Sequence, residues 1–373
     1  MNDSEQPRRL RVALLGAGNI SERYVIGMRR FGQLEIAGCA DVVPAAAEGL
    51  ARRTGIATYP TVEALLADPG VDIVVDITPP TAHEATALEI IGAGKHVYLE
   101  KPLTTEPATA AAVLQAAAAA GVLVGAAPDT FLGSAAQTAR RALDDGVIGV
   151  PIGALAAVRY SRAEEWHPDP SFLFQPGGGP SLDLGPYYLT ALVNLLGPVA
   201  QVSGFSRIGA PVRRFTAEQR RADSVEVTTP THASASLRFA SGAIATFISS
   251  FDIWDTSLPF IEVYGELGTL QVGDPNEYDS PVRIRRHSDA DWWEYEPVFP
   301  PSGQPGTPEQ LLRGAGVADL ATAVAGGTLR ASGDLARHVL DVIAAIDTSS
   351  ERSEVITIKS TTTRPAAADP NER

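Results

Sequence analysis

The feature that most constrains the fold is a glycine-rich turn between an apolar run and a helical stretch. Residues 10–15 read LRVALL, GAGNIS follows, and a helical pattern continues to Met28 before a second apolar run, LEIAGCAD. Strand, tight turn, helix and strand make one βαβ unit. Such a turn lets backbone N–H groups approach a pyrophosphate at the helix N-terminus, where the helix dipole favours an anion. The segment therefore carries the pattern of a dinucleotide-binding domain.

The alternation of strands and helices continues toward Pro128, where its pattern ends. The expected elements are a helix over 61–66, a strand over 71–77, a helix over 83–91, a strand over 96–100, an alanine-rich helix and a strand over 122–124. These strands are continuously apolar, which predicts a parallel sheet covered on both faces. We place a first domain at residues 1–128.

Longer strands without intervening long helices follow a helix over 135–143. They are expected at 152–160, 231–240, 242–251, 260–266 and 268–272, and we interpret them as antiparallel. Two late helices, 315–325 and 332–346, precede a VITI strand, and residues 297–308 form a proline-rich loop. The predicted fold is α/β, with a second domain at 129–360 and a poorly ordered tail at 361–373.

Composition excludes several classes of function. Thirty Lys and Arg against 44 Asp and Glu give a net charge of −14, which disfavours nucleic acid. The single cysteine, Cys39, cannot form an internal disulfide, and no apolar signal segment is visible, so we expect a cytoplasmic protein. The uncharged stretch 107–128 is divided by Gln115 and Gly121, which argues against a membrane span. His83 and Glu84 lack the second histidine of a metalloprotease motif, and no metal site is predicted.

The nucleotide site is predicted at the carboxyl edge of the first sheet. Gly16 and Gly18 supply the turn, but Ser21 replaces the usual third glycine, so the motif alone is also compatible with an ordinary tight turn. Asp41 ends the second strand, where a carboxylate would bind ribose hydroxyls and repel a 2′-phosphate, favouring NAD over NADP. The alternative for Asp41 is a turn aspartate before Pro44.

Two more segments reach the same predicted edge. Thr78 and Pro79 follow the third strand and either bind the cofactor or form a plain loop. Glu100 and Lys101 follow the fourth strand. An ammonium there would face the nicotinamide, donate to a substrate hydroxyl and stabilise alkoxide character. Taken alone, Lys101 also fits a solvated surface lysine.

A second motif, GGGPSLDLGPYY, lies in the expected second domain. Residues 177–179 allow close backbone approach, and Asp183 and Tyr187 are four residues apart, which predicts that they share one face of a helix. Tyr188 is expected to point elsewhere. The alternative is a glycine loop with a capping aspartate and a packed tyrosine.

The segment EEWHPDPSF is a candidate substrate loop. Trp166 offers a flat face to a sugar or nicotinamide, and His167 is a donor and a candidate acid or base. A packed tryptophan explains the pattern equally well. Arg162 in the same region and Asp129 in APDTF are further candidate substrate contacts.

The segments GAGNI, ADV, TPPTAHEATALEIIGAGKHVYLEKPL and GGGPSLDLGPYYLTALVNLLGPV together resemble the Gfo/Idh/MocA oxidoreductase family. The resemblance implies an N-terminal Rossmann domain, a C-terminal α/β domain with an open antiparallel sheet, and a homodimer or homotetramer. It makes Lys101 the catalytic lysine, Asp183 the motif carboxylate, and Tyr187 the proton donor and acceptor that replaces the histidine of many members. By the same resemblance, NAD would be held by Gly16, Gly18, Asn19, Ile20, Asp41, Thr78, Pro79, His83, Glu100 and Lys101.

Three functions remain open at this stage. The first is NAD-dependent hydride transfer at a secondary hydroxyl, at C3, of a pyranose or glycoside, with Tyr187 and Lys101 handling the proton. The second is an oxidoreductive glycosidase, which resembles some superfamily members, oxidises the sugar, eliminates the aglycone, adds water and returns the hydride. An anionic sulfoquinovoside, held by Arg159, Arg162 and His167, is a candidate substrate for it. The third is an NAD-binding regulator without catalysis.

Overall fold

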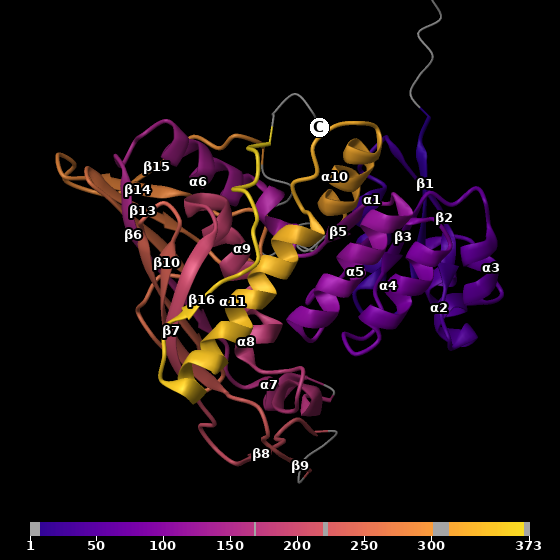
Figure 1. The fold of residues 1–373 in the computed structure, drawn as a ribbon, viewed down its shortest axis with the longest axis horizontal. Helices are drawn as coiled ribbons and strands as arrows, with labels where there is room; N and C mark the ends of the chain where they lie inside the picture. The colour runs from indigo at the N-terminus through magenta and orange to yellow at the C-terminus, as the bar shows by residue number, and fades with distance from the viewer. Residues whose placement is uncertain (1–7, 168, 219–222, 301–312, 369–373) are drawn as a thin grey trace, which may run out of the picture. The chain divides into compact units, whose positions relative to one another are not determined.

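The computed structural model describes residues 8–167, 169–218, 223–300 and 313–368, which form two compact units (Figure 1). Of the described residues, the first unit comprises those from 8 to 132 and those from 313 to 333. The second comprises those from 133 to 300 and from 334 to 368. The predicted division at residue 128 is therefore four residues early, and it assigned the returning segment to the wrong unit.

The first unit is built on a five-stranded parallel sheet in the order β2-β1-β3-β4-β5. Its strands are β1 (Leu10–Leu15), β2 (Leu34–Ala40), β3 (Ile73–Asp76), β4 (His96–Leu99) and β5 (Val124–Ala126). A single parallel bridge between Cys39 and Thr58 extends the sheet outside β2. With that bridge as an outer strand, the order matches a Rossmann sheet, whose strand order reverses beside β1.

Helices cover this sheet and their ends are set by local sequence. They are α1 (Ser21–Met28), α2 (Pro44–Thr54), α3 (Val62–Ala67), α4 (His83–Gly92), α5 (Pro107–Ala120) and α10 (Ala315–Val324). Pro44 and Pro107 stand at the first helical position, where the missing N–H costs nothing, and Gly55 and Gly121 end the same two helices in the left-handed conformation. Helix α2 was not among the elements predicted from the sequence, although Pro44 and Gly55 mark its two ends.

The returning segment belongs to the core of the first unit. Val317 and Leu320 of α10 pack with Tyr98 of β4 in the same buried cluster as β1 and β3. Gly316 is required there, because a Cβ at this position would lie 2.2 Å from the Tyr98 hydroxyl oxygen. Burial of this helix explains why a segment far along the chain folds with the first unit.

The second unit is built on a nine-stranded sheet in the order β15-β14-β13-β12-β6-β11-β10-β7-β16. Its strands are β6 (Pro151–Arg159), β7 (Val199–Arg207), β10 (His232–Phe239), β11 (Ile244–Ser250), β12 (Ile261–Gly265), β13 (Gly268–Val272), β14 (Arg283–Arg286), β15 (Trp293–Glu294) and β16 (Ile356–Thr357). A separate hairpin pairs β8 (Val212–Arg214) with β9 (Ser224–Glu226). The large sheet is mixed rather than wholly antiparallel, because β6 and β11 pair in parallel.

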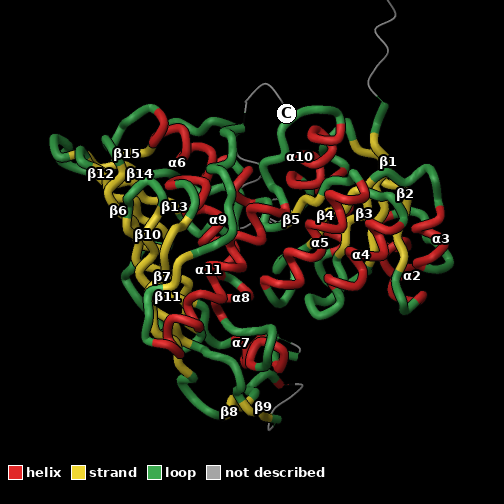
Figure 2. The backbone as a smooth tube through the Cα atoms, in the orientation of Figure 1, coloured by secondary structure: helices red, strands yellow, loops and turns green. Residues whose placement is uncertain are grey.

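The helices of the second unit gather on one face of its sheet, as Figure 2 shows for α6, α9 and α11. The unit contains α6 (Ser134–Asp144), α7 (Ala163–Trp166), α8 (Pro180–Asp183), α9 (Gly185–Leu196) and α11 (Gly333–Arg352), and the 3-10 turn η2 (Ser171–Phe174). Residues alternate buried and exposed along β10, which places its polar side chains on the other face. None of the described helices is long and apolar enough to cross a bilayer.

The C-terminal tail is held more firmly than expected. Arg140 donates to the Pro365 carbonyl oxygen at 2.6 Å, and the Ala368 amide donates to Gln137 at 2.8 Å. The prediction of a poorly ordered tail is therefore wrong for residues 361–368, while 369–373 lie outside the described residues. Of the predicted proline-rich loop, residues 301–308 also lie outside them.

His338 gives the second unit a dependence on pH. It is fully buried on α11, where its Nε2 accepts from the Val199 amide at 3.0 Å, and burial lowers its pKa. The unfolded chain takes up this proton more readily, so we expect the free energy of unfolding to fall as pH drops below about 6.5. Urea unfolding at pH 7.5, 6.5 and 5.5 measures the effect. His338→Gln keeps an acceptor for Val199 and should flatten this part of the profile; an unchanged slope contradicts the assignment.

Candidate functional site

The glycine turn between β1 and α1 assigns different tasks to its two glycines. Gly16 has φ +101°, its amide donates to Ala40 at 2.9 Å, and a Cβ there would lie 2.8 Å from the Ile77 carbonyl oxygen. Gly18 is exposed, and a Cβ would meet nothing within 4 Å. Gly16 therefore closes the turn against the sheet, and Gly18 leaves open the space that a phosphate needs. Asn19 and Ile20 complete the turn before α1.

Asp41 lies beside this turn at the carboxyl end of β2. Its two oxygens accept from the Ala17 and Val43 amides, each at 2.8 Å. The carboxylate is half-exposed, and each oxygen can still accept another hydrogen bond, which recognition of the two hydroxyls of a ribose requires. The residues present fit an NAD adenosine, and a carboxylate disfavours the 2′-phosphate of NADP.

The loop after β3 is held by a residue that sequence reasoning missed. Asp76 is fully buried, and one of its oxygens accepts from both the amide and the hydroxyl of Thr78, the hydroxyl at 2.6 Å. Thr86 of α4 donates to its other oxygen. An acidic residue at the end of the apolar run VDIVVD was the signal. Thr78 thus leaves the sheet in a defined position, with Pro79 exposed next to it.

His83 joins two loops, which corrects its prediction as a cofactor contact. The side chain is fully buried, so no part of it faces a ligand. Its Nδ1 lies 2.8 Å from the Pro102 carbonyl oxygen and its Nε2 lies 2.9 Å from that of Thr78. His83 therefore ties the Thr78 loop to the loop that carries Lys101, and it positions both.

Glu100 orients the backbone of the predicted catalytic lysine. Its carboxylate is buried and accepts from the Tyr24 hydroxyl and from the Lys101 amide, each at 2.8 Å. Burial, with the negative charge of Glu100, raises the pKa of Tyr24 well above its ordinary value, so Tyr24 remains a donor. Glu100 acts through Lys101, which is half-buried at the carboxyl end of β4.

Asp129 is a structural residue, and its prediction as a substrate contact is wrong. Its side chain is fully buried, and one carboxylate oxygen accepts from the Gly314 and Gly316 amides at 3.1 and 2.9 Å. These amides lie at the N-terminus of α10, where a carboxylate complements the helix dipole. Asp129 therefore anchors the returning helix.

The glycine motif of the second unit forms a close backbone approach. Gly179 has φ +85°, and a Cβ at Gly178 would lie 2.2 Å from the Phe172 carbonyl oxygen. Two helices follow rather than the expected one: α8 ends at Asp183 and α9 begins at Gly185. Asp183 is half-buried and Tyr187 is buried on α9.

A polar cluster forms around Asp183, and two of its members were missed. The Tyr188 hydroxyl donates to Asp274 at 3.4 Å, and burial raises the pKa of Asp274. Burial, Asp274 and Asp183 together raise the pKa of the Tyr160 phenol. We call Tyr160, Asp183, Tyr188 and Asp274 the acidic cluster. No linear motif marked Tyr160 or Asp274, because both come from segments that are distant in the sequence from Asp183.

An aromatic row adjoins the acidic cluster through Tyr160. The rings of Tyr160 and Trp166 meet edge to face with centroids 6.4 Å apart. The His167 ring contacts two neighbours edge to face, with its centroid 5.5 Å from that of Trp166 and 5.4 Å from that of Phe172. Tyr160, Trp166 and Phe172 are exposed. The predicted Trp166 and His167 therefore lie together on a surface that combines flat apolar rings with polar groups.

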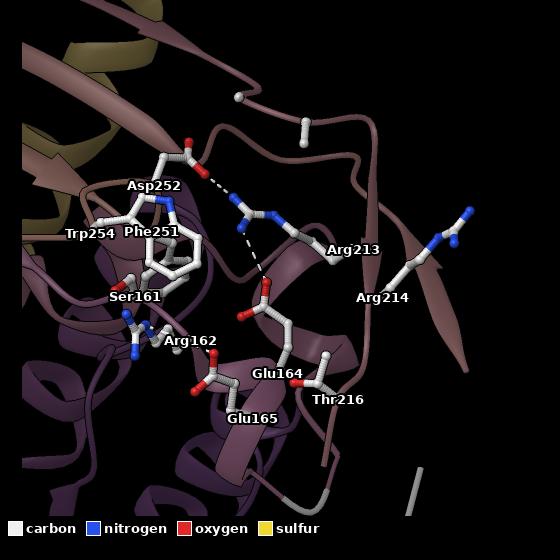
Figure 3. A pocket seen from close by; sticks show the side chains of 12 residues that line it. Ser161, Arg162, Glu164, Glu165, Arg213, Arg214, Thr216, Phe251, Asp252 and Trp254 are labelled. Carbon is white, nitrogen blue, oxygen red and sulfur yellow. Dashed lines mark hydrogen bonds and ion pairs between the residues drawn. The ribbon is translucent and has the colours of Figure 1, made fainter. Parts of the chain in front are cut away.

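Arg213 ties this surface to the sheet. Its guanidinium donates to Glu164 of α7 at 3.1 Å and to Asp252 after β11, and both contacts are drawn in Figure 3. The Glu164 carbonyl oxygen also accepts from the Thr216 and Ala217 amides. Glu164 therefore holds α7 in place and is engaged by Arg213.

Replacing Arg213 is expected to destabilise the second unit. Arg213→Met leaves two carboxylates, each more than three-quarters buried, facing each other without a cation. We expect a loss of about 2 kcal/mol in the free energy of unfolding, since unpaired buried charge is costly. Arg214→Met, at the exposed neighbour, should change it by less than about 0.5 kcal/mol. Equal effects of the two variants in urea unfolding would contradict this role.

Comparisons with known proteins agree with this architecture. Residues 10–127 match the model of the oxidoreductase family with NAD-binding Rossmann fold, and residues 136–271 match the GFO/IDH/MocA C-terminal domain. The chain belongs to the Gfo/Idh/MocA oxidoreductase family. Its first unit is therefore an NAD-binding Rossmann domain, as the sequence predicted.

Two relatives that match part of the chain are named for sugar and inositol chemistry. The chain is 35% identical over 145 residues to 1,5-anhydro-D-fructose reductase of Ensifer adhaerens, covering 39% of this chain and 44% of the relative. It is 34% identical over 163 residues to inositol 2-dehydrogenase of Acidothermus cellulolyticus, covering 41% and 46%. The matches thus span about half the length of these relatives.

The fold itself is shared over nearly the full chain. An NAD binding oxidoreductase from Klebsiella pneumoniae superposes with a TM-score of 0.82 at 24% identity, covering 95% of this chain and all of the other. Levoglucosan dehydrogenase in complex with NADH and levoglucosan superposes with a TM-score of 0.79 at 20% identity, covering 94% and 100%. At these identities the similarity establishes the fold.

Proposed function

We propose that this protein oxidises a secondary hydroxyl, at C3, of a pyranose or glycoside and passes the hydride to NAD. The observation that carries the proposal is the surface of the second unit, where the acidic cluster and the aromatic row share Tyr160. Carboxylates and phenols bind sugar hydroxyls, and flat rings pack on the apolar C–H face of a sugar. Relatives named for sugar and inositol chemistry support the same substrate class.

The reaction divides into a proton transfer and a hydride transfer. When bound, NAD⁺ accepts the hydride from the carbon that carries the hydroxyl. Tyr187, reacting as its phenolate, takes the hydroxyl proton and becomes a neutral phenol as the C–O bond becomes a carbonyl, and the Lys101 ammonium donates a hydrogen bond to the same oxygen. The Asp183 carboxylate orients the substrate by accepting hydrogen bonds from hydroxyl groups of the sugar. Lys101 lies in the first unit and Tyr187 in the second, so their cooperation is part of the proposal.

One assay tests the reaction class. Purified protein with NAD is offered free pyranoses, inositols, and methyl and aryl glycosides, while NADH absorbance and aglycone release are both followed. Stoichiometric NADH without aglycone is the expected result. Many aglycones per cofactor without accumulating NADH would instead establish the oxidoreductive glycosidase. Inactivity across the panel, with Tyr187→Phe indistinguishable from the parent in NADH binding, would favour the regulator.

Self-association through the open face of the second sheet is part of the same proposal. Phe205 and Ile244 are exposed on strands β7 and β11, and the register of β7, β10 and β11 places both on the same face of the sheet. Burying this face against a second copy would give a homodimer or, with a further interface, a homotetramer. We expect Ile244→Glu to lower the mass measured by light scattering to that of a smaller species. An unchanged mass excludes this face as the interface.

A further inference from the structure

A cavity of about 390 Å³ lies in the second unit between α7, the β8 strand and the segment after β11 (Figure 3). This volume falls within the range of small-molecule sites, roughly 300–1,000 Å³. The walls include Ser161, Arg162, Glu165, Asp252 and Trp254. None of these side chains has a part in the proton and hydride transfers proposed above.

Trp254 is the most unusual wall of this cavity, because its side chain is 71% exposed. The guanidinium carbon of Arg162 lies 4.6 Å from the centre of its ring and covers one face. An exposure this large requires the opposite face to be open. Leaving an indole face in water is unfavourable, and the ring is a ready platform for a flat apolar surface.

The arginines that face the cavity are paired with carboxylates. Three arginines and three carboxylates line it. Arg213 is engaged by Glu164 and Asp252, and Arg162 lies 3.8 Å from Glu165. Figure 3 shows the Arg214 side chain directed away from these groups. The two arginines that face the cavity are therefore both engaged by carboxylates, so the wall offers hydroxyl groups donors and acceptors and offers an anion no unpaired cation.

The cavity is continuous in sequence with the acidic cluster. Ser161 and Arg162 line it and directly follow Tyr160, whose phenol senses the charge of Asp183. The backbone at Arg162 is left-handed, with φ +70°, so the chain turns sharply between the cluster and the cavity. Tyr160 is therefore the residue that links the acidic cluster to the cavity wall along the chain.

We propose that this cavity binds an uncharged sugar ring stacked on the open face of Trp254. The ring is the part of the substrate that does not react, so the preferred substrate is a neutral two-ring glycoside rather than a free monosaccharide or a sulfonated sugar. The proposal rests on sugar oxidation as the proposed function.

Binding is tested first without NAD. Saturation-transfer NMR is recorded with methyl glycosides and disaccharides of the common neutral hexoses and with glucose 6-sulfate as the anionic probe. We expect at least one disaccharide to bind, with affinity at least tenfold lower in Trp254→Ala and intermediate in Trp254→Phe, which keeps a flat ring. Trp292→Ala is the matched control, because Trp292 is also exposed, at 37%, and lies outside the cavity. Binding independent of Trp254, absence of binding across the panel, or tighter binding of the sulfate overturns the proposal.

Kinetics then separate this proposal from the proposed function. In Trp254→Ala, KM for the two-ring substrate should rise at least tenfold, while KM for its monosaccharide stays unchanged. If Trp254→Ala and the parent transfer hydride to NAD with the same kinetics on every substrate, the proposed role of the cavity is overturned and the proposed function stands. Disaccharide binding that depends on Trp254, without hydride transfer to NAD, overturns the proposed function alone.

Discussion

Tyr187→Phe is expected to lower kcat for sugar oxidation by about 10²–10⁴-fold, the range for loss of a general acid or base. The substitution removes one hydroxyl from a buried side chain of α9 and keeps the ring, so the fold should persist. The dissociation constant for NADH should stay within a factor of about three, because the cofactor is bound by the other unit. Steady-state kinetics and NADH fluorescence measure the two quantities.

Tyr188→Phe is the matched control for this prediction. Tyr188 is the next residue on α9, equally buried, and its hydroxyl contacts Asp274. We expect a change in KM from the altered acidic cluster and a much smaller change in kcat. Equal losses in kcat for the two variants would remove Tyr187 from its proposed role. Lys101→Met should also lower kcat. If both side chains act on one oxygen, the double variant Lys101→Met with Tyr187→Phe should lose less activity than the two single losses multiplied together.

Gly18→Ala and Gly16→Ala are expected to fail in different ways. Gly18 has open space around it, so an alanine should leave the melting temperature unchanged while its methyl blocks backbone approach to the pyrophosphate. We expect NADH affinity to fall at least tenfold. At Gly16 the methyl would meet the Ile77 carbonyl oxygen at 2.8 Å from a backbone with φ +101°. That variant should lose about 2 kcal/mol or more of stability.

Thermal unfolding and NADH titration of both variants test this contrast. Gly94→Ala is a useful reference for backbone strain alone, since Gly94 has φ +71° and no neighbour within 4 Å of a Cβ. It should lower stability modestly and leave NADH affinity intact. A Gly18→Ala variant that binds NADH like the parent would show that the cofactor does not approach this turn closely.

Local patterns predicted the first unit well because its chemistry is local. A parallel strand ends at the same edge as its neighbours, so Asp41, Thr78 and Lys101 were expected together from their positions after apolar runs. The roles of His83 and Asp129 could not be predicted this way. Both are polar residues near the predicted edge, and only their burial against Pro102 and Gly316 distinguishes positioning from ligand contact.

In the second unit, local patterns predicted less of the site than contacts between distant segments decide. The spacing of Gly177, Asp183 and Tyr187 identified the motif, but the sheet that surrounds it pairs strands far apart in the sequence, including β6 with β11 in parallel. Tyr160 follows β6 and Asp274 follows β13, so neither is near Asp183 in the sequence, although both carboxylates act on the Tyr160 phenol. Arg213, which fastens the aromatic row, lies on a hairpin with no recognisable motif.

The sequence by itself determined the βαβ order, the glycine turn, the family and the cofactor, because each depends on residues close together or at fixed spacing. The tertiary structure alone decided that α10 completes the first unit, that α8 and α9 are separate helices, and which side chains surround Asp183 and Trp254. The physical reason is that burial and pairing of side chains depend on contacts between distant segments. No periodicity within one segment specifies those contacts.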